Sequence, residues 1–294
     1  EVERQVRGLN VAAGQHHDLV ARVIDAVVEQ QSIPVVTDPE AAIEVPSELR
    51  RSDGASMYER VHQLRYTSRR ILEAEEFIRE TARSQDGATV GEEAVTVALL
   101  ESVANGVELN PQQTRLVREF ATSGSRVQLA LAPAGTGKTT AMRVLARAWE
   151  NGGGTVVAAA PTHVAVDGLQ TAMDAPGGTI ASLTAALTHG TALPAWAENI
   201  NAGSLVVVDE AGMAGTFELA ELISFATSRG ASIRLIGDHQ QLAAVAAGGV
   251  LRDIVADDTV ATVTLDEVMR FVDPDEAAAS CGGFFSSPFR SSML

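Results

Sequence analysis

The segment 132–140, with the sequence APAGTGKTT, constrains this chain more than any other. It stands between an apolar run at 127–131 and a helix-patterned stretch at 141–149. A strand, a glycine-rich turn and a helix in this order are the setting of a phosphate-binding loop. Glycine lets the backbone fold closely around a phosphate, and the start of the helix adds partial positive charge. The segment therefore predicts a site for nucleotide phosphates.

The residues expected to bind the nucleotide are those of the loop and the first helical turn: Ala134, Gly135, Thr136, Gly137, Lys138, Thr139 and Thr140. Lys138 is expected to reach the β- and γ-phosphates of ATP, and the Thr139 hydroxyl to ligate Mg²⁺. Among 22 basic residues Lys138 is the only lysine. Ala132 stands where the usual pattern has glycine, and its small side chain is compatible with the loop. The alternative is a Gly/Thr-rich turn that carries an incidental lysine.

From residue 107 onward, short β-rich runs alternate with helical segments. The runs lie at 127–132, 155–160, 204–208, 232–236 and 260–265. This alternation predicts an α/β fold, a parallel sheet with helices on both faces, whose ligands bind beyond the carboxyl ends of the strands. The domains expected are a helical lead-in at 1–106, the nucleotide-binding domain at 107–273 and a disordered tail at 274–294.

The lead-in has helical spacing of its apolar residues in three places. Helices are predicted at 18–30, at 68–83 with Thr67 as its cap, and at 90–105 with Gly106 at its end. The proline-containing stretch 32–52 is predicted to be an irregular connector.

Two carboxylates follow the apolar run 205–208, which is typical of a buried parallel strand. Asp209 is expected to belong to the Mg²⁺ shell. Glu210 is placed to orient and deprotonate the water that attacks the γ-phosphate. A solvated strand end is the alternative, although the pairing with the loop at 132–140 favours the catalytic interpretation.

Gln113 has two interpretations of equal weight. Asn110 is a good helix N-cap, Pro111 suits the first helical position, and Gln113 can close a capping box. The other interpretation is that Gln113 contacts the adenine edge of a nucleotide.

Polar residues also follow the other strands. Gln241 is a candidate γ-phosphate sensor after the strand at 232–236, and Arg270 a candidate charge stabiliser or a plain surface residue. Thr162 can cap the helix that begins near His163.

Composition limits the remaining function classes. The net charge of −16 means that the chain has no bulk basic surface for nucleic acid. The single cysteine, Cys281, excludes a disulfide framework. No apolar run approaches the roughly 20 residues of a membrane span, so a cytoplasmic protein without membrane contact is expected. The chain begins without methionine, which suggests a piece of a longer polypeptide.

In their order, these segments resemble the motifs of superfamily 1 helicases of the RecD-like branch. LNPQQ resembles the Q motif, APAGTGKTT motif I, APTHVAVDGL motif Ia, VVVDEAGM motif II, LIGDHQQL motif III and LDEVMR motif IV. The resemblance implies a RecA-like P-loop domain, adenine contact by Gln113, γ-phosphate sensing by Gln241 and phosphate contact by Arg270. It also implies that the loop Pro161, Thr162 and His163 touches single-stranded DNA.

Within that branch, the chain is most similar to the helicase region of TraI/TrwC (MobF)-type conjugative relaxases. The segment 49–76 resembles the segment that those proteins carry just before the Q motif. This implies the ATP-binding first motor domain of a DNA helicase, with other conjugation or relaxosome proteins as further partners. The relaxase and second motor domains are expected to be missing, with the chain truncated after motif IV, so that ATP hydrolysis and single-stranded DNA binding are weak. The alternatives are a P-loop ATPase that does not act on DNA, or a remnant without enzymatic activity.

Overall fold

The computed structural model describes residues 65–133, 135–238 and 248–265, together with 32–35 and part of 19–26. The chain divides between Ala74 and Glu75 into two compact units. The sheet and all candidate site residues discussed below belong to the second unit.

The first unit contains a small antiparallel sheet that the sequence did not predict. Strand β1 (Ser32–Val35) pairs with β2 (Arg65–Ser68), with Ser32 opposite Ser68. The expected irregular connector is therefore wrong for its first four residues, because a two-stranded sheet consists only of edge strands and an edge strand tolerates Pro34. The described residues between 19 and 26 are helical, within the helix predicted at 18–30.

Helix α3 (Arg69–Arg83) follows β2 directly. The hydroxyl of Ser68 accepts a hydrogen bond from the backbone N–H of Ile71 at 3.2 Å. The cap is therefore Ser68 and not Thr67, which lies inside the strand.

The second unit is built on six parallel strands in the order β5-β4-β6-β7-β3-β8. Their bounds are β3 Val127–Leu131, β4 Thr155–Ala160, β5 Gly177–Thr179, β6 Ser204–Val208, β7 Ser232–Gly237 and β8 Thr262–Thr264. The predicted α/β fold class with a parallel sheet is confirmed. Strand β7 lies between β3, which leads into the glycine-rich loop, and β6, which leads into the two carboxylates.

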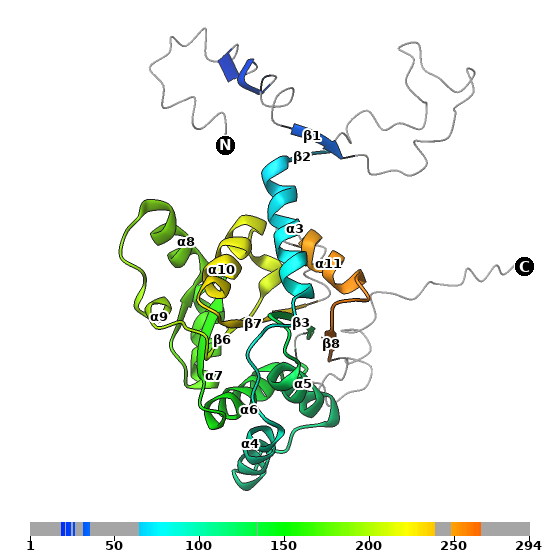
Figure 1. Ribbon diagram of the computed structural model, residues 1–294, viewed down its shortest axis with the longest axis vertical. Helices are drawn as coiled ribbons and strands as arrows, with labels where there is room; N and C mark the ends of the chain where they lie inside the picture. The colour runs from blue at the N-terminus through cyan, green and yellow to red at the C-terminus, as the bar shows by residue number, and fades with distance from the viewer. Residues whose placement is uncertain are drawn as a thin grey trace, which may run out of the picture. The chain divides into compact units, whose positions relative to one another are not determined.

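Helices cover both faces of the sheet (Figure 1). One face carries α4 (Glu92–Ala104), α5 (Pro111–Thr122), α6 (Lys138–Asn151) and α7 (His163–Met173). The other carries α8 (Ile180–His189), α10 (Thr216–Ser228) and α11 (Gly248–Ala256), and two short turns, α9 (Ala195–Glu198) and η3 (Ala211–Met213), complete the described elements. Strands covered on both sides have no solvent face, so every residue of β3, β6 and β7 is buried.

Helix α4 shares the core beneath α5 and α6. Its Val95 and Ala98 belong to the same buried cluster as Met142 and Trp149 of α6. Consequently the boundary predicted at residue 106 falls inside the second compact unit, which begins at Glu75. Gly106 ends this helix as predicted, and it adopts the left-handed conformation, with φ 77°, that is common just after a helix.

Among the residues that the structure describes, one charged side chain lies within the core. Arg234 of β7 is completely buried, and its Nε donates to the carbonyl of Phe120 at 2.8 Å. Its Nη1 donates to the carbonyls of Ser125 and Ile233, both at 2.9 Å. Burial lowers the pKa of the guanidinium to about 9, so it remains charged at neutral pH. Arg234 thus fastens β7 to the C-terminal end of α5.

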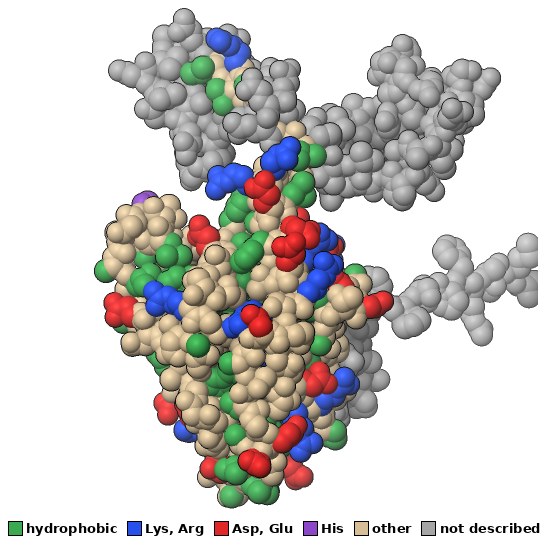
Figure 2. All heavy atoms as spheres, viewed as in Figure 1, with side chains coloured by type: hydrophobic (Ala, Val, Ile, Leu, Met, Phe, Trp, Pro, Cys, Tyr) green, Lys and Arg blue, Asp and Glu red, His purple; other side chains and the backbone are tan. Residues whose placement is uncertain are grey.

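On the face of the molecule in view, acidic and basic side chains are interspersed over the described surface, without an extended basic area (Figure 2). None of the helices in the described ranges combines the length and the apolarity that crossing a bilayer demands.

Candidate nucleotide-binding site

The glycine-rich loop connects β3 to α6, as the sequence predicted. Gly135 and Gly137 both adopt left-handed backbone conformations, with φ of 88° and 73°. Residues with a Cβ rarely adopt this backbone conformation, which explains why glycine stands at both positions. Thr136 between them is almost fully buried, and its hydroxyl donates to the carbonyl of Pro133 at 2.9 Å. At the start of the loop, the Ala132 N–H donates to the carbonyl of Gly237 in β7 at 2.8 Å.

Lys138 and Asp209 meet at the carboxyl edge of the sheet. Lys138 is the first residue of α6, and its Nζ lies 2.8 Å from Oδ1 of Asp209, which follows β6. The same Oδ1 accepts the backbone N–H of Glu210 at 2.8 Å. The two side chains are 26% and 14% exposed, so the pair is accessible from solvent. The fold therefore brings the predicted phosphate anchor and the predicted metal ligand together.

Glu210 occupies a strained backbone position. Its φ of 53° and ψ of 35° place it in the left-handed region. Among the described non-glycine residues, only Asp174 also has a positive φ. Such conformations cost of order 1–3 kcal/mol and are often found at functional sites. The Thr162 hydroxyl, which caps α7 by accepting from the Ala165 N–H at 3.2 Å, lies 3.5 Å from Glu210 Oε2. The sequence contains no signal for this backbone conformation.

Gln113 closes the predicted capping box. The Asn110 side chain accepts the backbone N–H of Gln113, and the Gln113 side chain accepts the backbone N–H of Asn110. In addition, Gln113 Nε2 donates to the carbonyl of Thr136 at 3.0 Å, which links α5 to the glycine-rich loop. The sequence did not predict this contact, and the capping pattern alone gives no indication of it. The adenine contact expected for Gln113 stays a prediction.

The side chains at this edge suit a magnesium ion. Thr139 supplies a hydroxyl in the first turn of α6, and Asp209 supplies a carboxylate at the end of β6. Mg²⁺ prefers oxygen ligands, and it is usually held by one or two protein groups together with water and phosphate oxygens. One hydroxyl and one carboxylate beside the glycine-rich loop match that donor set.

Three of the predicted site residues lie outside the described residues, namely Ala134, Gln241 and Arg270. Their predicted roles are therefore not examined by the structure. Pro161, Thr162 and His163 lie between β4 and the first turn of α7, at the same edge as Glu210.

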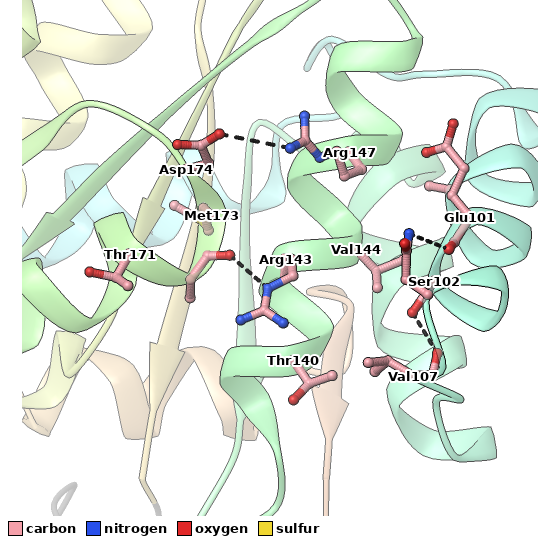
Figure 3. Close-up of a pocket in the computed structure, with 13 residues that line it drawn as sticks. Glu101, Ser102, Val107, Thr140, Arg143, Val144, Arg147, Thr171, Met173 and Asp174 are labelled. Atoms are coloured by element: carbon pink, nitrogen blue, oxygen red, sulfur yellow. Dashed lines mark hydrogen bonds and ion pairs between the residues drawn. The ribbon is translucent and has the colours of Figure 1, made fainter.

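A cavity of about 280 Å³ lies along α6 near the predicted site, between the C-terminal parts of α4 and α7 (Figure 3). Arg143 and Arg147 of α6 point towards α7, where Arg143 Nε donates to the Ala172 carbonyl at 3.2 Å and Arg147 lies 3.8 Å from Asp174. Thr140 lines this cavity, whereas Lys138 does not. The cavity thus shares Thr140 with the predicted nucleotide site but does not include Lys138. Its two arginines were not predicted from the sequence.

Comparison with known proteins agrees with this geometry. A family model described as an AAA domain matches residues 108–282, which is more than half of the chain. The chain is 30% identical over 152 residues to a probable conjugal transfer protein TraA of Sinorhizobium fredii and to a conjugal transfer protein TraA of Rhizobium radiobacter. It is 28% identical over 177 residues to a conjugal transfer protein TraA of Agrobacterium fabrum.

These alignments cover 52% to 60% of the chain but only 13% to 15% of the relatives' length. The matches confirm the resemblance inferred from the motifs, a RecD-like domain with distant and partial similarity to conjugal transfer proteins of the MobF type.

Proposed function

Because this chain belongs to the AAA domain family, whose members are nucleotide-binding, we propose that it binds Mg·ATP at its glycine-rich loop as a motor domain of a RecD-like DNA helicase. The observation that carries the proposal is the 2.8 Å contact between Lys138 Nζ and Asp209 Oδ1. It joins the end of the phosphate-binding loop to the acidic tip of β6, two strands away. A cation and a carboxylate at this distance are the two protein charges that a metal-bound triphosphate needs.

On nucleotide binding, Lys138 would exchange Asp209 for the β- and γ-phosphate oxygens, and the backbone N–H groups around Gly135 and Gly137 would surround the β-phosphate. Thr139 and Asp209 would hold Mg²⁺. When bound, the ion would neutralise negative charge on the phosphates. Asp209 would then be released from its ion pair to Lys138 as the lysine turns to the phosphates.

Glu210 would act as general base. It follows Asp209 directly, and only the weak 3.5 Å contact with Thr162 engages its carboxylate among the described residues. A carboxylate with little hydrogen bonding keeps the capacity to accept a proton from water. We expect Glu210→Gln to retain ATP affinity and to lose whatever hydrolysis the chain performs, as measured by phosphate release. Equal rates in both proteins would remove Glu210 from this role.

The DNA part of the proposal is supported by similarity to proteins named for conjugal transfer and by the position of Thr162 beside Glu210. A contact of single-stranded DNA with Pro161, Thr162 and His163 would lie at the same edge as the nucleotide. Turnover by this chain is expected to be slow and its DNA affinity low at a net charge of −16. ATP hydrolysis that single-stranded DNA stimulates would support the helicase assignment. ATP hydrolysis at the same rate with and without DNA would favour a P-loop ATPase that does not act on DNA.

The decisive test of nucleotide binding is Lys138→Ala, with titration calorimetry against Mg·ATP. Arg115→Ala is the matched control, because it also removes one positive charge but from an exposed position paired with Glu119. We expect binding by the wild type and the control, and none by Lys138→Ala with an unchanged circular dichroism spectrum. Unchanged affinity of Lys138→Ala would refute the proposed site.

A further inference from the structure

The carboxamide of Gln113 is engaged on both sides by the protein backbone. Gln113 is only 4% exposed. Its Oε1 accepts the Asn110 N–H at 3.0 Å, and its Nε2 donates to the carbonyl of Thr136 at 3.0 Å and, at 3.4 Å, to that of Gly137. The acceptor half of the amide therefore closes the capping box of α5, while the donor half holds the glycine-rich loop.

The two carbonyls that Nε2 holds immediately precede Lys138. A peptide unit is planar and trans, so its C=O and N–H point in opposite directions. When the Thr136 carbonyl points towards α5, the N–H of Gly137 is turned away from α5. That N–H donates to no acceptor in the part of the chain that the structure describes. An amide N–H held in this orientation is what an anionic phosphate oxygen requires.

The space beside Gly137 is filled by the same amide. A Cβ placed on Gly137 would lie 2.3 Å from Gln113 Nε2, far closer than atoms can approach. The absence of a side chain at Gly137 therefore leaves the room that the Gln113 amide occupies. Helix α5 carries this contact at its N-terminal end, and Arg234 fixes its C-terminal end to β7.

We propose that Gln113 is a positioning residue that holds the Thr136–Gly137 peptide of the loop in its phosphate-binding orientation, whichever base the nucleotide carries. This inference rests on the proposed binding of nucleoside triphosphates at the loop. It differs from contact with adenine, because a glutamine that reads the base would have to present its amide to the ligand. A positioning glutamine affects phosphate binding alone, and it does so before any nucleotide is present.

The experiment compares the wild type with Gln113→Met and Asn110→Ala. Methionine keeps the length and the unbranched shape of glutamine but removes the Nε2 donor. Asn110→Ala is the matched control, because it removes the other half of the capping box and leaves the contact of Gln113 with the loop in place. Affinities for ATP, GTP and inorganic tripolyphosphate are measured by calorimetry with Mg²⁺. Hydrogen exchange of the peptide spanning 132–140 is measured without nucleotide.

For Gln113→Met we expect all measurable affinities to fall by a common factor of about five to thirty, which corresponds to the loss of one or two hydrogen bonds at about 1 kcal/mol each. The loop peptide should exchange faster than in the wild type. Asn110→Ala should stay within about twofold in affinity and match the wild type in exchange. If Gln113→Met does not fold, Gln113→Glu replaces it, since its carboxylate still accepts the Asn110 N–H but cannot donate to Thr136.

Loss of ATP affinity alone, with GTP unaffected, would assign Gln113 to the base and overturn the proposal. Unchanged loop exchange in Gln113→Met would overturn it equally. A wild type that binds none of the three ligands would instead refute the proposed function, and the exchange measurement would still decide whether Gln113 holds the loop.

Discussion

Replacement of Gly137 by alanine tests how closely the loop packs against α5, because it should lower the free energy of unfolding. Two terms contribute to this loss. A left-handed conformation costs a residue with a Cβ roughly 1–2 kcal/mol. The new Cβ would also lie 2.3 Å from Gln113 Nε2, so the amide must move and give up its hydrogen bonds to the loop. At about 1 kcal/mol for each net hydrogen bond, the second term adds about 1–2 kcal/mol. Together they predict a loss of about 2–4 kcal/mol.

Gly153→Ala separates these terms. Gly153 has the same kind of backbone, with φ 84°, but nothing lies within 4 Å of an added Cβ. Gly153→Ala should therefore lower the free energy of unfolding by the conformational term alone, roughly 1–2 kcal/mol. Combining Gly137→Ala with Gln113→Ala completes the comparison. Without the amide in the way, Gly137→Ala should cost no more than Gly153→Ala.

Urea-induced unfolding followed by tryptophan fluorescence is a suitable assay, because Trp149 is buried in α6, the helix that Gly137 precedes. The free energies are comparable only if the dependence on urea is the same in all variants. The reasoning is refuted if Gly137→Ala costs no more than Gly153→Ala. It is also refuted if the excess cost persists when Gln113 is alanine.

Three further predictions concern stability and titration. Arg234→Lys should lower the free energy of unfolding by about 2 kcal/mol in urea, since one ammonium keeps the buried charge but cannot reach both carbonyls at the end of α5. The Asp257 carboxyl should titrate by NMR with a pKa of about 2, because hydrogen bonds from Thr259, followed by those from Arg83, favour its charged form. Its contribution to stability should accordingly be complete above the unfolded pKa of about 3.9 and be lost as the pH falls through 2, and Thr259→Val should raise the pKa. Glu210→Asn should raise the free energy of unfolding by about 0.5–1 kcal/mol, because asparagine tolerates a left-handed backbone better than glutamate. A variant that is less stable than the wild type would contradict the backbone strain inferred at this position.

Local sequence signals predicted the elements whose cause is local. Four apolar residues before Asp209 predict a buried strand, and β6 is there. Asn110, Pro111 and Gln113 predict a helix start with a capping box, and both of its hydrogen bonds are present. These features depend on residues within a few positions of one another, so the sequence displays them directly.

Elements that depend on distant contacts were missed. Strand β5 has the sequence GGT, and two of its three residues are glycines, which are depleted in strands. It forms because glycine permits close approach: a Cβ on Gly177 would lie 2.4 Å from the Ala158 carbonyl oxygen, and one on Gly178 would lie 2.2 Å from Nε1 of Trp196. Neither partner is near in sequence.

The candidate site divides in the same way. The identities of Lys138, Asp209 and Glu210 followed from motifs. The ion pair between the first two was not predicted, because it depends on the order of the strands in the sheet. The left-handed backbone of Glu210 and the contact of Gln113 with the loop were not predicted either, because both depend on how the chain packs after the motifs are in place.

The position of β7 between β3 and β6 sets the distance between the two strand ends that lead into the predicted site. Neighbouring strands lie about 4.8 Å apart, so the ends of β3 and β6 are separated by about 10 Å. A tetrahedral phosphate with a hydrated metal ion beside it has about this diameter. Had β3 and β6 been adjacent, their ends would lie at only half that distance. Because the inserted strand ends at Gly237, it places no side chain between the end of β3 and the end of β6.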